Sequence, residues 1–142
     1  MPNDLFFKVM NTIHHSLLNV SGGRIGWAIG GMPVLKLTTV GRKSGTPQSV
    51  LLTIPAQEDG RLVIVASKGG ADTHPSWFLN LQQDHHVIVT MKGKDSFSMV
   101  ARVASGKEHE RLWLMITSKH DNYASYQGKT ARKIPVVILE SS

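Results

Sequence analysis

The chain has 142 residues and a mass of 15.6 kDa, and 41% of its residues are hydrophobic and 18% charged. These are values of one globular domain that can bury its own core, and no apolar run approaches the roughly 18 residues of a membrane-spanning helix. The chain has no cysteine, which excludes disulfides, thiolate zinc sites and cysteine nucleophiles. A formal net charge of +6 favours anionic partners.

Residues 1–21 are predicted to form an N-terminal amphipathic helix. Apolar residues recur there at spacings of three and four, and Gly22 and Gly23 would end the helix. Polar residues interrupt the segment, so it is not expected to be a secretory signal. Together with the lack of cysteine, this predicts a cytoplasmic protein. The face that carries Phe6 and Lys8 is compatible with a peripheral contact to an acidic membrane.

Strands are expected to dominate residues 34–104. The runs VLKLTTV, QSVLLTIPA and RLVIVAS, at residues 34–40, 48–56 and 61–67, are separated by turn-like segments and therefore predict an antiparallel meander. A short helix is predicted near residues 75–83, because a proline suits the first helical turn. HVIVTMK and FSMVARVA then predict another hairpin.

The C-terminal part is predicted to hold one further helix and one strand. Ser105 and Glu108 have the spacing of a capping box, so a helix is expected over residues 105–119. IPVVIL, at residues 134–139, is the last strand. The connections are too short for many parallel crossovers. The predicted fold class is therefore mainly β (α+β): a single domain over residues 1–142, with an antiparallel barrel-like sheet and peripheral helices.

Basic residues and glycines gather at two turns of the predicted meander. Alternate turns of a meander lie at opposite ends of the sheet, so GRKSG and SKGG would share one end. Their charged and hydroxyl side chains are Arg42, Lys43, Ser44, Ser67 and Lys68. The N-terminus of the following helix would also favour an anion. The two turns together predict a phosphate pocket, although either turn alone could be a solvated loop.

Other motifs are absent or weaker. GxGxxG, GxxxxGK[ST] and GxSxG do not occur, and the seven histidines show no ligand spacing, so no metal site is predicted. Tyr123 and Tyr126 are three residues apart and would share one side of a helical turn. Trp27 and Trp77 could line a flat apolar slot, although such aromatic residues more often have structural roles. Basic and aromatic residues do not alternate along a strand, which argues against nucleic-acid binding.

Three motifs in order resemble the signatures of one family. VLKLTTVGRKSGTP, VIVASKGGADTHPSWFLNL and YASYQGKTARKIPVVIL are similar to those of the deazaflavin-dependent nitroreductase family, actinobacterial reductases that use coenzyme F420. The similarity runs from about Gly22 to Leu139. The resemblance implies an antiparallel split β-barrel related to the FMN-binding one, with coenzyme F420 as cofactor and a small conjugated molecule as substrate.

The resemblance also implies roles for individual residues. The cofactor would contact Arg42, Lys43, Ser44, Lys68, Gly69, Gly70, Ala71, Pro75, Ser76, Trp77 and Asn80. The catalytic residues would be Ser67, Tyr123 and Tyr126, and the substrate would contact Trp27, Trp77, His120 and the two tyrosines. Gln48 stands where family members commonly have an arginine, and His120 where some have a third tyrosine. A changed cofactor contact and a changed pocket wall are therefore expected.

The implied reaction is transfer of a hydride from C5 of reduced coenzyme F420 to a quinone, an α,β-unsaturated lactone such as a coumarin, or a nitroaromatic. A neutral hydroxyl from Ser67, Tyr123 or Tyr126 would stabilise or protonate the oxygen that becomes negative. The alternative is a non-catalytic carrier or store of the coenzyme. The choice between monomer and homodimer, the physiological substrate and the use of FMN stay open at this point.

Overall fold

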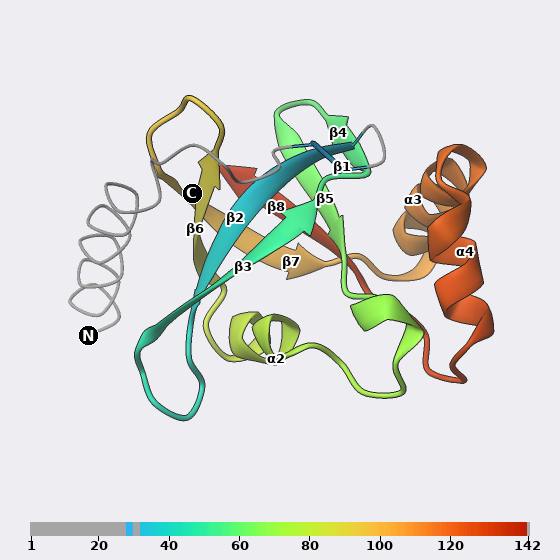
Figure 1. Cartoon of the computed structure of the whole chain (residues 1–142), viewed down its shortest axis with the longest axis horizontal. Coiled ribbons are helices and arrows are strands. Elements are labelled where there is room, and N and C mark those ends of the chain that lie inside the picture. Colours follow the sequence, from blue (N-terminus) through green and yellow to red (C-terminus); the bar gives the residue numbers. More distant parts are fainter. Residues whose placement is uncertain (1–27, 30–31, 142) are drawn as a thin grey trace.

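The computed structural model describes residues 28–29 and 32–141, and its centre is one antiparallel sheet curved into a half barrel (Figure 1). The strands are β1 (Ala28–Ile29), β2 (Met32–Val40), β3 (Pro47–Thr53), β4 (Ala56–Glu58), β5 (Arg61–Val65), β6 (His86–Met91), β7 (Phe97–Val103) and β8 (Val136–Ser141). The helices are α2 (Ser76–Gln83), α3 (Gly106–Lys119), α4 (Asp121–Gly128) and the short 3-10 helix η1 (Lys68–Gly70). The N-terminal helix expected over residues 1–21 lies outside the described residues.

The strand pairing confirms two of the predicted hairpins. β2 pairs with β3 and, on its other side, with β6, which forms the second hairpin with β7. From β6 the sheet continues through β7, β8 and β5 to β4. All of these pairs are antiparallel, as the short connections predicted.

The predicted meander is wrong in its second strand and in the pairing of that strand with the third. Residues 48–56 do not form one strand but divide into the end of β3 and the start of β4, with Ile54 and Pro55 between them. Pro55 has no N–H to donate to a ladder, so strand pairing is interrupted there. β4 then turns back onto β5, whose other partner is β8. β3 and β5 therefore do not pair, and the barrel stays open along a seam between them.

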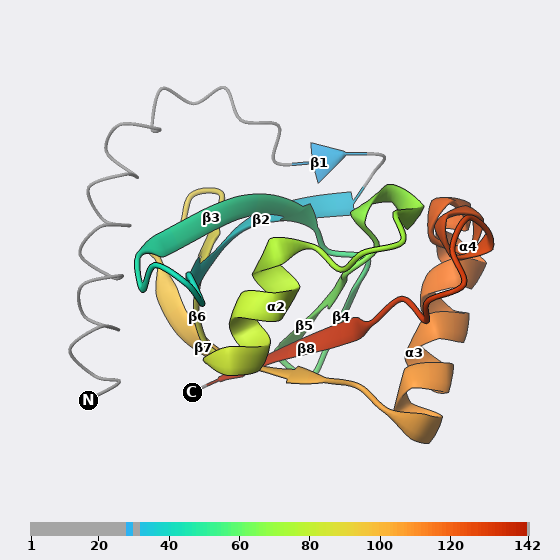
Figure 2. The ribbon, with the colours of Figure 1, turned by 90° about the horizontal axis from the view of Figure 1, so that it is seen from below.

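Helix α2 lies in the opening of the barrel, between β3 and β5 in the view of Figure 2. Its side chains Trp77, Phe78 and Leu81 belong to the core inside the barrel, together with Leu37 of β2 and Ile64 of β5. Because strand side chains alternate between faces, residues 63 and 65 of β5 point to the other side. There they pack in a second core with residues of α3 and α4.

The two C-terminal helices cover the outer face of β5 and β8. Ser105 precedes α3 as its N-cap, but the predicted capping box does not form. The Glu108 carboxylate instead accepts two hydrogen bonds from the Arg102 guanidinium, at 2.6 and 3.0 Å. α4 is an eight-residue helix where the sequence indicated only a helical turn. Within the described part of the chain, no helix is long and apolar enough to cross a membrane.

Candidate active site

The open seam of the barrel forms a cleft of about 600 Å³, called the seam cleft below. β3 supplies one wall from Gln48 to Thr53, and the opposite wall combines η1, the first turn of α2 and α4. The predicted site residues that line the cleft are Ser67, Lys68, Gly69, Pro75, Ser76, Trp77, Asn80, Tyr123 and Tyr126. The second and third sequence motifs therefore meet here, because β3 and β5 separate.

The corner of the seam cleft at Ser67 and Lys68 is suited to an anion. Ser67 has right-handed backbone angles, with φ −78° and ψ −36°, and Lys68 follows with a left-handed φ of 46°. Successive residues of these two conformations form a nest, in which N–H groups converge on an anion. Pro75 and Ser76 bring the N-terminus of α2 to the same cleft. The helix dipole there also favours negative charge.

Asn80 of α2 is buried, with 1% of its surface exposed, and it joins the helix to the β2–β3 hairpin. Its Nδ2 donates hydrogen bonds to Thr39 Oγ1 at 3.1 Å and to Gln48 Oε1 at 2.8 Å. Its Oδ1 accepts hydrogen bonds from the Arg42 N–H at 3.1 Å and from Arg42 Nη1 at 2.9 Å. Gln48, where an altered cofactor contact was expected, is thus both a cleft residue and a partner of Asn80.

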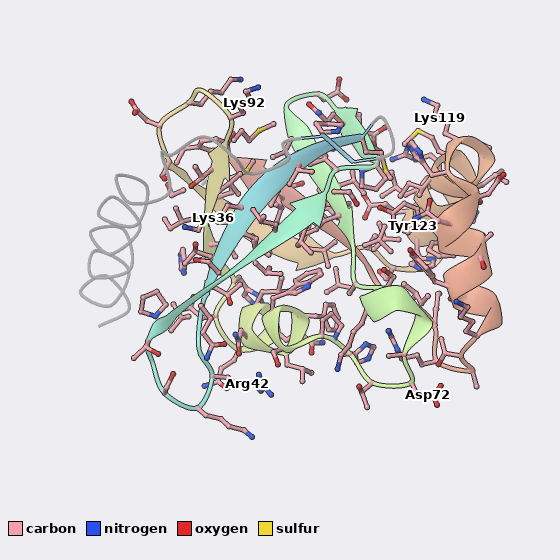
Figure 3. The ribbon with its side chains drawn as sticks, in the orientation of Figure 1. Lys36, Arg42, Asp72, Lys92, Lys119 and Tyr123 are labelled. Atoms are coloured by element: carbon pink, nitrogen blue, oxygen red, sulfur yellow. The ribbon has the colours of Figure 1, made fainter. Side chains whose placement is uncertain are left out.

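The basic turn of the β2–β3 hairpin lies at the same end of the molecule as α2 and η1 (Figure 1). Arg42 is labelled at this end in Figure 3, and it lines a second hollow beside α2 and the start of β6. Its guanidinium contacts Asn80 and the carbonyl of Ser76. Lys43 and Ser44 are exposed on the turn. Of the two predicted basic turns, only the one at Lys68 lines the seam cleft.

Gly70 and Ala71 lie behind the cleft wall, where they pack against α4 and the chain that follows it. A Cβ atom on Gly70, whose φ is +86°, would come within 2.7 Å of the Tyr126 carbonyl oxygen. Only glycine therefore allows η1 to approach α4 this closely. The Ala71 carbonyl accepts a hydrogen bond from Arg132 Nε at 2.7 Å. The structure thus gives both residues structural contacts.

Tyr123 and Tyr126 both line the cleft from α4, but their surroundings differ. Tyr123 is buried, and its hydroxyl lies 2.7 Å from Thr53 Oγ1 at the end of β3. Burial raises the pKa of the Tyr123 hydroxyl, with a smaller opposing effect from the bond to Thr53. The ring of Tyr126 is half-buried, perpendicular to that of Tyr123, with Lys129 Nζ 5.8 Å from its centroid. Tyr126 is therefore the tyrosine with the greater access to the cleft.

The predicted substrate residues fall into three groups. Trp77 both lines the cleft and packs in the barrel core, and 8% of its surface is exposed. His120 precedes α4, and its ring lies 6.4 Å from that of Tyr123, outside the cleft lining. Trp27 lies outside the described residues. Among the residues that the structure describes, no group of three acidic or histidine side chains could hold a metal ion.

His74 predicts a pH dependence of stability. Burial, and then the positive charge of Arg132, lower the pKa of His74 below its usual 6.5, so the neutral ring can accept a hydrogen bond from Arg132 Nη1 at 3.1 Å. Below pH 6.5 the unfolded chain gains a proton that the folded chain resists, so stability should fall as pH falls. We expect His74→Asn, whose Oδ1 can still accept, to flatten this slope in urea unfolding between pH 7.5 and 5.

His85→Asn, which removes an exposed histidine, is the control for that measurement. An unchanged slope in His74→Asn would show that another group causes the acid sensitivity.

Comparison with known proteins identifies the family of this chain. The family of F420H(2)-dependent quinone reductases matches residues 10–141. The chain belongs to this family. The enzyme class and coenzyme implied by the three motifs, a reductase that uses reduced coenzyme F420, are thereby confirmed.

Individual relatives and solved structures are similar to this chain over most of its length. A reductase of this name from Mycobacterium tuberculosis is 36% identical over 131 residues, which is 89% of this chain and 87% of the relative. A solved F420-H2 dependent reductase (FDR-A) is 39% identical, with a TM-score of 0.67 over 76% of this chain and 94% of that one. Another solved structure, described as a domain-swapped dimer, is 34% identical, with a TM-score of 0.71 over 99% of this chain and 100% of that one.

More distant structures share the fold alone. A protein of the pyridoxinephosphate oxidase family from Clostridium acetobutylicum is 9% identical, with a TM-score of 0.53 over 93% of this chain and 84% of that one. The predicted antiparallel split barrel is confirmed for the described residues.

Two site features were missed by sequence reasoning. The first is the hydrogen-bond centre at Asn80, which was expected only to contact the cofactor. The second is Arg132, whose guanidinium reaches the backbone of residues 66–71. Arg132 stands within the third motif, YASYQGKTARKIPVVIL, and this position was the only available signal.

Proposed function

We propose that this F420H(2)-dependent reductase transfers a hydride to a flat conjugated acceptor bound in the seam cleft. Quinones are the first substrate class, as in the family, and α,β-unsaturated lactones such as coumarins and nitroaromatics are the next. The observation that carries the proposal is that one cleft brings together the corner at Lys68 and the tyrosines of α4. Both lie opposite the unpaired edge of β3. The corner at Lys68 favours an anion, and the adjacent helix α4 offers the tyrosine hydroxyl groups.

The lining of the cleft fits a coenzyme that has a planar ring and an anionic tail. The phosphate would lie at Lys68 and Gly69, where backbone N–H groups and an ammonium group are available. The ring would lie along the apolar side chains Val50, Leu52 and Trp77, which also line the cleft. Ligand sites of this kind are mostly apolar, with a few polar groups that fix orientation.

The chain itself would supply position and a proton. Reduced coenzyme F420 supplies the hydride, which carries two electrons and one proton, and a quinone needs a further proton to become a quinol. Tyr126 is half-buried and lines the cleft, and its hydroxyl would donate that proton or stabilise the oxygen that becomes negative. Ser67 lies on the same cleft wall and is the second candidate.

The decisive experiment is oxidation of reduced coenzyme F420 by the purified protein in the presence of quinones, coumarins and nitroaromatics. We expect turnover with quinones to be the fastest. Tight binding of the coenzyme without oxidation by any acceptor would contradict the enzyme and support the alternative, a carrier or store of the coenzyme. Absence of binding would refute the proposed site as well.

Lys68 is expected to contribute directly to coenzyme affinity. Lys68→Met keeps most of the side-chain length and should weaken binding by about 1.5 to 3 kcal/mol, the range of a hydrogen bond to a charged group. Lys92→Met removes the same charge at the opposite end of the molecule (Figure 3) and is the control for net charge. Calorimetric titration of both variants at two salt concentrations measures the effect. Equal affinities of the two variants for the coenzyme would show that Lys68 does not contribute to the site.

Lys43→Met tests, in the same titration, whether the β2–β3 turn contributes to coenzyme binding in addition to the corner at Lys68. A loss of affinity in this variant would indicate that the coenzyme's anionic tail reaches the β2–β3 turn, as the sequence predicted. An unchanged affinity would confine the tail to the corner at Lys68.

A further inference from the structure

The chain around η1 adopts a conformation that needs support. Lys68, Gly69 and Gly70 have φ angles of 46°, 64° and 86°, so three successive residues are left-handed. For lysine this region is sterically unfavourable, and such backbone persists only where the surroundings hold it. Within the segment, Gly70 N donates to the Ser67 carbonyl and Ala71 N to the Lys68 carbonyl, and Lys68 Nζ donates to Thr73 Oγ1 at 3.2 Å. Additional contacts must therefore fix its shape.

A single guanidinium supplies those contacts. Arg132 Nε donates to the Ala71 carbonyl at 2.7 Å, Nη2 to the Ser67 carbonyl at 2.8 Å and Nη1 to the Ala66 carbonyl at 3.2 Å. Nη1 also lies 3.1 Å from His74 Nδ1. The planar arrangement of five N–H donors makes this possible, and a lysine ammonium could not reproduce it.

Arg132 is itself fixed by α4. Gln127 of α4 donates from Nε2 to the Arg132 carbonyl at 2.7 Å, and its Oε1 accepts from the Ile134 N–H at 2.9 Å. Gln127 follows Tyr126 directly, and Gly70 packs on the Tyr126 backbone. The segment at residues 66–74, Arg132 and the C-terminal end of α4 around Tyr126 thus form one connected unit.

The hydrogen bond to Ser67 also sets the direction of an N–H group in the cleft wall. In a trans peptide the C=O and the following N–H point in opposite directions. Because the Ser67 carbonyl points to Arg132, the N–H of Lys68 points away from Arg132. Lys68 lines the seam cleft and Arg132 does not, so this N–H is available to the nest.

We propose that Arg132 is a positioning residue that holds residues 66–71 in the anion-binding conformation and in register with Tyr126. The proposal rests on the proposed coenzyme site for its effect on binding, but its effect on the backbone can be measured without any ligand. It assigns to Arg132 a role that differs from adding positive charge, since its donors are used on carbonyl oxygens behind the cleft wall.

Arg132→Lys and Arg132→Met test the proposal. In the ligand-free protein we expect hydrogen exchange at residues 66–74 to be about tenfold faster in both variants, because the loss of these bonds opens the segment locally. Exchange in β7 should be unchanged. With reduced coenzyme F420, KM should rise about tenfold or more while kcat falls less, since the residue acts on binding geometry. Arg132→Ala should recover part of its affinity when guanidinium is added at low concentration.

Arg111→Lys is the matched control, because Arg111 also makes two hydrogen bonds through its guanidinium, to the exposed carboxylate of Glu58. Wild-type exchange at residues 66–74 in Arg132→Met would overturn the proposal, because the segment would then hold its own shape. Full activity and affinity in Arg132→Lys would overturn it in favour of charge alone. If the wild-type protein does not bind reduced coenzyme F420, the proposed function fails, whereas the exchange experiment still decides the role of Arg132.

Discussion

Replacing Asn80 with alanine is expected to lower the free energy of unfolding by about 3 kcal/mol and the Tm by about 10 °C. The substitution removes four hydrogen bonds from a buried amide, which join α2 to Thr39, Gln48 and Arg42. It also leaves Thr39 Oγ1, which is buried, without this donor. Unpaired buried polar groups cost more than the mean contribution of a hydrogen bond, so the loss should exceed that of a surface substitution.

Coenzyme affinity should fall in the same variant, because the first turn of α2 and the Gln48 side chain both line the seam cleft. Gln82→Ala is the matched control, since Gln82 is exposed on the same helix and the change also replaces a side-chain amide by alanine. Urea unfolding and calorimetric titration measure the two effects. An Asn80→Ala protein as stable as Gln82→Ala would show that water replaces the amide without cost.

The local elements of the fold could be predicted from the sequence, whereas the pairings between distant strands could not. β-branched runs identified β2, β5, β6 and β7 within a few residues, because each strand pattern is contained in its own segment. Which strands pair depends on contacts between distant segments. β5 pairs with β8, about seventy positions later in the chain, and no turn signal connects them. Pro55 was the one local sign that β3 ends early.

The same distinction applies to the site. The corner at Lys68 and the tyrosines could be named as candidates because they stand in motifs that can be read in order, and the structure places them on one cleft. Arg132 was not found, because its contacts with the Ser67 and Ala71 carbonyls depend on backbone directions about sixty residues away. The separation of β3 from β5, where the meander prediction failed, is also what creates the seam cleft. An incorrect pairing in the prediction thus concealed how the two motifs meet.

The tyrosines of α4 are expected to differ strongly when each loses its hydroxyl. Tyr126→Phe should slow single-turnover reduction of a quinone by about 100-fold or more, the lower end of the range for general acid catalysis. Tyr123→Phe should leave that rate within a few-fold, because its hydroxyl is engaged with Thr53 and burial raises its pKa. Tyr123→Phe should instead lower the free energy of unfolding by about 1 kcal/mol, a typical net value for one hydrogen bond.

A double-mutant cycle separates the two roles. If the Tyr123 hydroxyl joins α4 to the end of β3, the stability losses of Tyr123→Phe and Thr53→Val should not add, because the two groups form one bond 2.7 Å long. The turnover rate of Thr53→Val should then match that of Tyr123→Phe. A slow Tyr123→Phe with a fast Tyr126→Phe would reverse the assignment and make the buried tyrosine the proton donor. Fast turnover in both would leave Ser67 as the remaining predicted donor, since its hydroxyl side chain belongs to the same cleft wall as Lys68.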